Sequence, residues 1–177
     1  MVLAAPVAVA DFYSVGEEDV LSAPQPLSYE EVVLNDGPIA YWRLGEAGGP
    51  SVTDLSGNGH NGLASGGVQF GQASQVPGEA DTAVRTVGNE RIVIPGFQKF
   101  GPGSTGFSVE YWINLKSAAG VANIVGDGES GGDFYLMNYL VNGRIRPHYS
   151  FANAPVAMDS NAVLSAGTTY HVVTTWS

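Results

Sequence analysis

Asp54, Ser56 and Asn58 place side-chain oxygens at alternate positions of the sequence, and Gly59 follows them. Oxygen ligands at this spacing resemble the start of the loop with which an EF-hand wraps Ca²⁺. The closing glutamate of such a loop is missing, because Ser65 stands at that position. The alternative is an Asx turn, in which Asp54 and Asn58 bond to nearby backbone. Asp54 and Asn58 are therefore candidate calcium ligands, with a purely structural turn as the competing interpretation.

A second acidic segment offers three carboxylates within seven residues, from Asp127 through Glu129 to Asp133, with no basic residue nearby. Mutual repulsion among these carboxylates would favour a bound cation, and Ca²⁺ prefers such oxygen ligands. Glycines make up much of the same segment, which is equally typical of a solvated hairpin loop. Asp127, Glu129 and Asp133 are the second set of candidate calcium ligands.

The segment 107–115 alternates between apolar and polar residues and predicts a strand with two different faces. Trp112 shares the polar face with Glu110 and Asn114, and a flat ring beside hydrogen-bonding groups is typical of sugar recognition. Glu110, Trp112 and Asn114 are therefore candidate glycan-binding residues. The alternative is that a second layer or a loop covers this face, which would make Trp112 part of a core.

Catalytic patterns are weak in this sequence. Glycosidases need two carboxylates that flank the scissile bond, and the expected strands carry single acids such as Glu110. No nucleophile-elbow motif occurs, and the absence of cysteine excludes thiol catalysis and cysteine-bound zinc. The three histidines, His60, His148 and His171, show no metal-ligand spacing. We expect a protein that is not an enzyme.

Short strands with frequent turns must position these residues. The 177 residues include 24 Gly and 10 Pro, which indicates many turns. Asn142-Gly143 predicts a type I′ hairpin. The expected fold is all-β, an antiparallel two-sheet jelly-roll sandwich over residues 28–177. The expected strands are 39–44, 83–87, 91–94, 107–115, 134–141, 144–151 and 170–176.

One short helix is expected near the N-terminus, over 28–36. Ser28 and Glu31 have the spacing of a capping box, in which each side chain accepts a hydrogen bond from the other residue's backbone. Gly37 and Pro38 then end the helix.

Residues 1–27 read as an extended acidic arm. The net charge is −10, and residues 1–42 supply −7 of it with seven acids and no Lys or Arg. This charge opposes nucleic-acid binding and docking on anionic membranes. No run approaches the length of a membrane-spanning helix, and the apolar opening lacks the basic residues of a signal peptide. We expect the arm to pack on a partner protein or on the main domain.

Four segments resemble laminin-G-like, concanavalin-A-like jelly-roll domains, and they occur in the order of that family. They are GPIAYWRLGE at 37–46, DLSGNGHNG at 54–62, FSVEYWI at 107–113 and LSAGTTYHVV at 164–173. The family continues with another hairpin, whereas this sequence stops in strand rhythm at Ser177. We therefore expect the chain to be the N-terminal part of a longer polypeptide.

The resemblance implies a module that is mostly non-catalytic. Such domains occur in adhesins, in sugar-binding appendages of secreted enzymes and in the tail proteins of bacteriophages. Since a secretory signal is not recognisable, we expect a structural or adhesion module of a virion, such as a minor tail protein. Its partners would be other virion or surface-assembly proteins bound through residues 1–27, with possible contacts to host glycans. The alternative is a secreted carbohydrate-binding module at a bacterial cell surface.

Overall fold

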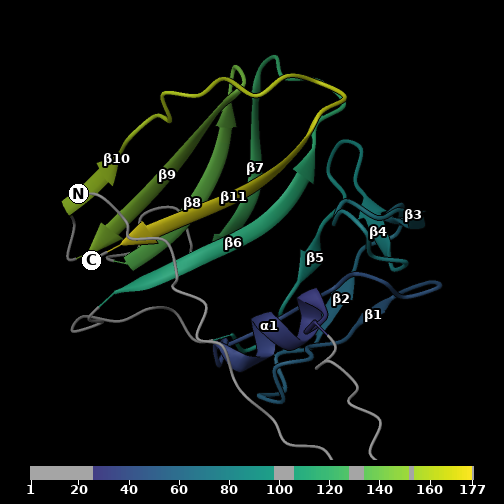
Figure 1. The fold of residues 1–177 in the computed structure, drawn as a ribbon. Helices are drawn as coiled ribbons and strands as arrows, with labels where there is room; N and C mark the ends of the chain where they lie inside the picture. Colours follow the sequence, from purple (N-terminus) through teal and green to yellow (C-terminus); the bar gives the residue numbers. More distant parts are fainter. Residues whose placement is uncertain (1–25, 98–105, 128–133, 152–153, 177) are drawn as a thin grey trace, which may run out of the picture.

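The computed structural model describes residues 26–97, 106–127, 134–151 and 154–176 (Figure 1). Within them the chain is mostly strand, with several antiparallel sheets and one short helix, as the sequence predicts. This part holds no helix with the length and apolarity needed to cross a bilayer. The helix is α1, Tyr29–Asn35, and the strands are β1 (Ser51–Val52), β2 (Gly62–Ala64), β3 (Gln69–Ala73), β4 (Thr82–Arg85), β5 (Ile92–Val93), β6 (Phe107–Asn114), β7 (Val121–Asp127), β8 (Phe134–Val141), β9 (Arg144–Phe151), β10 (Ala154–Ala157) and β11 (Thr169–Trp176).

Two sheets form the larger body of the molecule. One has the order β10-β9-β8-β7, and the other is the pair β11-β6, which crosses in front of it in Figure 1. Apolar side chains from both sheets meet in two clusters that exclude water. Phe107, Leu136 and Tyr149 form one, while the other consists of Leu115, Leu140, Ile145 and Leu164.

The β8–β9 hairpin and strand β6 confirm their predictions. Asn142 and Gly143 both adopt positive φ, 48° and 83°, as a type I′ turn requires. Strand β6 pairs with β11 along its whole length, from Phe107 opposite Trp176 to Asn114 opposite Thr169. Directly opposed residues share a face, so this register puts the polar residues of β6 beside those of β11.

The smaller sheets, β1-β2-β5 and β3-β4, lie on the same side of the larger body as α1 (Figure 1). The expected strands 83–87 and 91–94 correspond to β4 and β5, but they do not pair with each other. Instead β4 pairs with β3 and β5 with β2. In the segment between β4 and β5, Glu90 accepts the Val87 N–H. Strands β1, β2, β3, β7 and β10 were not predicted, since they are short or lack clear alternation.

The strand expected over 39–44 is wrong. No ladder forms there, although the apolar alternation resembles that of a strand. Tyr41 N–H donates to the Asp54 carboxylate and the Tyr41 carbonyl accepts from Leu55 N–H, so these backbone groups are used by a turn. Leu44 then takes a positive φ of 63°, which no regular strand permits.

Helix α1 begins with the predicted capping box. Ser28 Oγ accepts from Glu31 N–H at 3.2 Å, and Glu31 Oε2 accepts from Ser28 N–H at 2.8 Å. The helix has seven residues and none of them is buried. The arm predicted for 1–27 lies outside the described residues, apart from its last two positions.

Candidate functional site

The polar face of β6 and β11 carries an aromatic and ionisable cluster. Trp112 lies opposite His171 in the ladder, and the two rings stack with centroids 4.6 Å apart and an interplanar angle of 15°. His171 Nε2 lies 2.8 Å from Glu110 Oε1. The side chains of His171 and Glu110 are 39% and 43% exposed, so this edge of the cluster is open to solvent.

Tyr29 reaches this face from the first turn of α1. Its hydroxyl donates to Glu110 Oε1 at 2.8 Å and accepts from Trp112 Nε1–H at 3.0 Å. The Tyr29 ring meets Trp112 edge to face, with centroids 6.2 Å apart. Burial, followed by the hydrogen bond to Glu110, raises the pKa of Tyr29 to about 12. The hydroxyl therefore keeps its proton at any physiological pH.

Asn114 takes part in a separate contact at the end of the same face. Its Nδ2–H donates to Thr169 Oγ1 at 3.0 Å, and the Thr169 hydroxyl donates to Gln75 Oε1 at 2.8 Å. Gln75 belongs to the loop between β3 and β4. The polar face is therefore joined both to α1 and to this loop, which matches the covered-face alternative in part, while Glu110 remains accessible.

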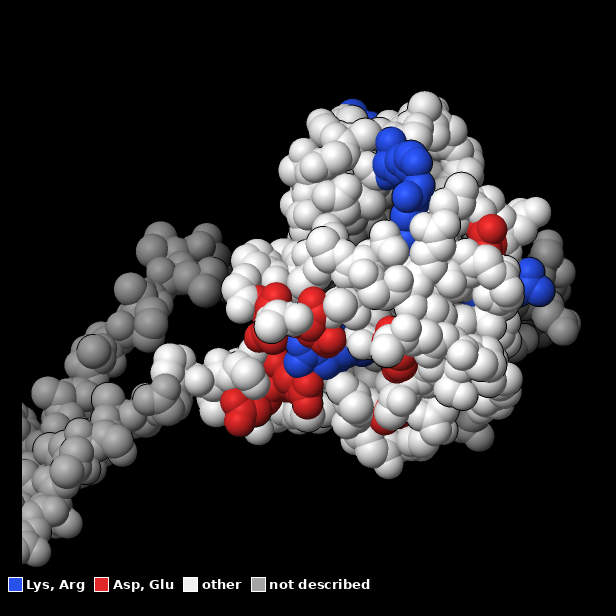
Figure 2. All heavy atoms as spheres, turned by 90° about the vertical axis from the view of Figure 1, so that its right-hand side faces the viewer, with Lys and Arg blue, Asp and Glu red and all other residues white. Residues whose placement is uncertain are grey.

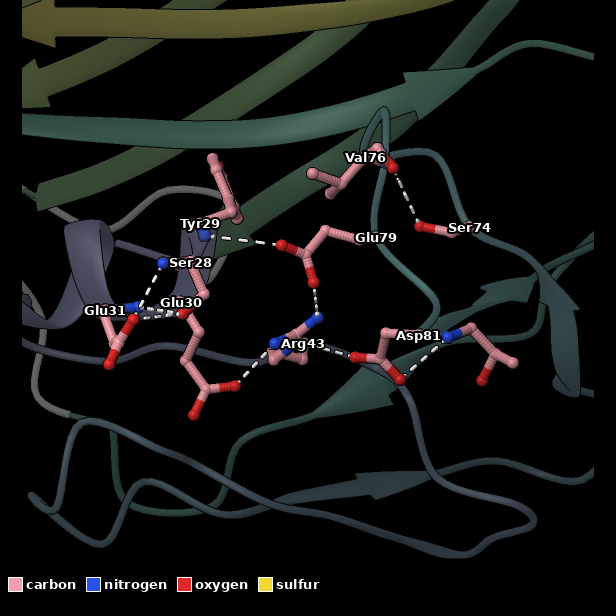
Figure 3. Close-up of polar contacts among 10 residues, drawn as sticks. Ser28, Tyr29, Glu30, Glu31, Arg43, Ser74, Val76, Glu79 and Asp81 are labelled. Atoms are coloured by element: carbon pink, nitrogen blue, oxygen red, sulfur yellow. Dashed lines mark hydrogen bonds and ion pairs between the residues drawn. The ribbon is translucent and has the colours of Figure 1, made fainter. Parts of the chain in front are cut away.

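Arg43 joins three segments beside this face. Its guanidinium contacts Glu30 of α1 at 2.6 Å, Glu79 of the β3–β4 loop at 3.0 Å and Asp81 of the same loop at 2.6 Å (Figure 3). Figure 2 shows carboxylates gathered around a basic side chain on one face of the molecule. Glu79 also accepts from Tyr29 N–H at 3.4 Å, so the cluster positions the residue that reaches Glu110.

The charge balance of the Arg43 cluster is one cation against three carboxylates. Burial by itself lowers the pKa of Arg43, but its hydrogen bonds with Glu30 and Glu79 outweigh burial and raise it. Arg43 is therefore always charged, and its side chain is only 18% exposed. The sequence offers no signal for this cluster, because its members come from segments up to 51 residues apart.

Asp54 organises the turn that follows β1. Its Oδ1 accepts from Tyr41 and Ser56 N–H at 2.9 and 3.0 Å, and its Oδ2 accepts from His60 N–H at 2.9 Å. Burial raises the pKa of Asp54, but these hydrogen bonds outweigh burial and lower it to about 2. Asn58 Nδ2–H donates to the Ile39 carbonyl at 2.9 Å. This is the hydrogen bonding of an Asx turn, and calcium binding at Asp54 and Asn58 stays a prediction.

The second calcium prediction falls mostly beyond what can be described. Asp127 ends β7, whereas Glu129 and Asp133 lie outside the described residues. Among the residues that the structure describes, no three His, Asp or Glu side chains stand close enough to hold a metal ion.

No family model, curated protein or solved structure matches this chain. The likeness to laminin-G-like domains therefore rests on the four sequence segments alone.

The structure places Glu110 and Trp112 together, as the sequence predicts, and adds two residues that sequence reasoning missed. His171 could have been found, because its alternation with Tyr170 and Val172 puts it on the polar face of β11. Nothing local marks Tyr29, whose hydroxyl meets a carboxylate 81 residues away.

Proposed function

We propose that this chain is a non-catalytic structural and adhesion module with the jelly-roll sandwich of laminin-G-like domains. Its setting would be a bacteriophage virion, as a minor tail or surface protein that docks through residues 1–27. The alternative setting is a secreted carbohydrate-binding module at a bacterial surface. Two sheets that share core clusters on their facing sides support the sandwich.

One observation carries the non-catalytic part of the proposal, namely the engagement of the carboxylates around Arg43 and of Asp54. Glu30, Glu79 and Asp81 hold Arg43, and Asp54 accepts three backbone N–H groups. Carboxylates committed to such structural bonds are poor proton carriers, because each transfer would break a contact between segments. Their arrangement supports a protein whose charges build a scaffold.

Mass spectrometry of purified particles tests the virion setting. The chain should be present in particles, and chemical cross-linking should connect residues 1–27 to a second particle protein. Recovery of the chain as a freely secreted monomer with no such cross-links would overturn this setting. It would leave the bacterial-surface alternative.

Glycan contact is a second candidate function, and the cluster of Glu110, Trp112 and His171 favours it. A carboxylate acceptor, an indole donor and stacked rings at a partly exposed edge are the groups that bind polyhydroxylated ligands. On an array of bacterial cell-wall saccharides, we expect binding that Trp112→Ala and Glu110→Gln abolish. Thr175→Ala, on the same face but bonded to Ser108, is the matched control and should bind normally.

A further inference from the structure

We propose that Tyr29 is an internal occupant of the Glu110–Trp112 site, and that a saccharide hydroxyl takes the place of its phenol hydroxyl on binding. The inference rests on the glycan-contact candidate, and it states how access to that site is controlled. The Tyr29 side chain, held on helix α1, would then be a displaceable cover.

The Tyr29 hydroxyl makes the two hydrogen bonds that a sugar hydroxyl would make in this site. This single oxygen donates to Glu110 Oε1 at 2.8 Å and accepts from Trp112 Nε1–H at 3.0 Å. A sugar hydroxyl, which is also both donor and acceptor, can make the same two bonds. Exchange of one hydroxyl for the other would leave neither Glu110 nor the indole N–H without a partner.

The exposure of the site gives a ligand a way in while Tyr29 is still in place. His171 Nε2 lies 2.8 Å from the same Glu110 Oε1 that Tyr29 uses. The side chains of His171 and Glu110 stay partly exposed while Tyr29 is in place. A ligand can therefore first contact this open edge and then replace the hydroxyl, without prior unfolding of α1.

Helix α1, which carries Tyr29, is short and weakly anchored. A helix of seven residues is marginal by itself, and its apolar residues Val33 and Leu34 are only half-buried. Besides the bonds of the Tyr29 hydroxyl, its polar contacts with the rest of the described chain include the Glu30–Arg43 ion pair and the long 3.4 Å bond from Tyr29 N–H to Glu79. Both anchors lie at the first turn, so rotation of the Tyr29 side chain away from Glu110 need not break the Glu30–Arg43 pair.

An internal occupant lowers the apparent affinity for a ligand by the fraction of molecules in which the site is free. If Tyr29 fills the site in all but about a tenth of molecules, its removal tightens binding about tenfold. Tyr29→Ala empties the site, while Tyr29→Phe keeps the ring and removes only the hydroxyl.

The experiment compares the full chain with Tyr29→Ala, Tyr29→Phe and Val32→Ala on a cell-wall saccharide array, followed by titration calorimetry with the strongest hit. Val32 lies on the same helix with its side chain exposed, so Val32→Ala controls for general effects on α1. We expect Tyr29→Ala to bind about tenfold more tightly than the unaltered chain, and Val32→Ala to bind equally. Addition of Trp112→Ala to Tyr29→Ala should abolish the gain.

The outcomes separate this inference from the glycan proposal. If the unaltered chain binds a saccharide through Trp112 and Tyr29→Ala leaves the affinity unchanged or weaker, the role of Tyr29 is wrong while glycan contact stands. If neither chain binds any saccharide although both keep a native circular dichroism spectrum, both proposals are overturned.

Discussion

Arg43 Nη1 lies 2.6 Å from Glu30 Oε2, and this pair fastens helix α1 to an irregular segment 13 residues further along the chain. The same guanidinium holds Glu79 and Asp81. A single side chain thus neutralises part of an acidic cluster and sets the position of α1 relative to the β3–β4 loop.

Removal of Arg43 should be costly, because three carboxylates would face one another without a cation. We expect Arg43→Ala to lower the free energy of unfolding by about 2 kcal/mol, since truncation of one partner leaves the other charges half-buried and unpaired. Urea denaturation measures the change. Arg146→Ala is the matched control, because Arg146 pairs with one exposed carboxylate, that of Asp159, and its removal leaves no half-buried charges facing one another. Equal effects of the two substitutions would contradict the role of Arg43.

A substitution at Gly45 tests the same Arg43 cluster, because Gly45 lies against Asp81. A Cβ at this position would overlap the Asp81 carboxylate, so Gly45→Ala must push Asp81 away from Arg43. We expect a loss of about 1 kcal/mol, because the flexible Asp81 carboxylate can move at low cost but gives up its ion pair with Arg43. Gly48→Ala is the control, because a Cβ there meets nothing within 4 Å. Thermal unfolding of the two variants should separate them clearly, and a stable Gly45→Ala protein would argue against the Asp81 contact.

We expect the turn that Asp54 holds together to lose stability in acid. Its pKa is lowered from an ordinary 3.8 to about 2, so the charged carboxylate stabilises the folded state by about 2 kcal/mol above pH 4. This contribution should fade as the pH falls from about 4 through about 2. Asp54→Asn should remove it, because an amide NH₂ would face the His60 N–H in place of Oδ2. Unfolding curves between pH 7 and pH 2 should show the variant and the unaltered chain converging, and parallel curves would contradict this account.

Asn138 is a buried polar residue between the two apolar clusters. It is fully buried on β8 between Leu136 and Leu140, which belong to different clusters, and its amide interacts with the buried hydroxyl of Tyr149. We expect Asn138→Leu to destabilise the fold by about 1–3 kcal/mol, because it removes the partner of the Tyr149 hydroxyl and forces a larger side chain into a filled site. Asn138→Asp should destabilise it by about 3 kcal/mol. Urea midpoints measure both, and a gain of stability in Asn138→Leu would contradict the contact with Tyr149.

Calcium is tested by its removal. If Asp127, Glu129 and Asp133 bind Ca²⁺, the chain should melt at a higher temperature with Ca²⁺ than after chelation, because the ion binds only the folded state. Asp133→Asn should then abolish this difference in melting temperature. If Asp54 and Asn58 form the calcium site instead, Asn58→Ala should abolish the difference and Asp133→Asn should not. Calorimetry with no heat of Ca²⁺ binding to the chelated protein would remove both sites.

Several features of the fold could be predicted because their atoms are close in sequence. The Ser28–Glu31 capping box and the Asn142-Gly143 turn each depend on bonds between residues no more than a few positions apart. The alternation in β6 predicted which residues lie on the polar face, and thereby placed Glu110 beside Trp112. Over 39–44 the alternation of apolar and polar residues predicted a strand that does not form. The pattern cannot reveal that Asp54 accepts a hydrogen bond from the Tyr41 N–H.

The sequence by itself determined the strand-rich character, the helix start and the two-faced strand of this protein. Tertiary structure alone decided which strands pair, as with β4 and β5, and which side chains meet across long separations, as with Tyr29 and Glu110. The physical reason is that local patterns depend on backbone conformation over a few residues. A contact across 81 residues depends on how whole surfaces pack, and no short stretch of sequence carries that information.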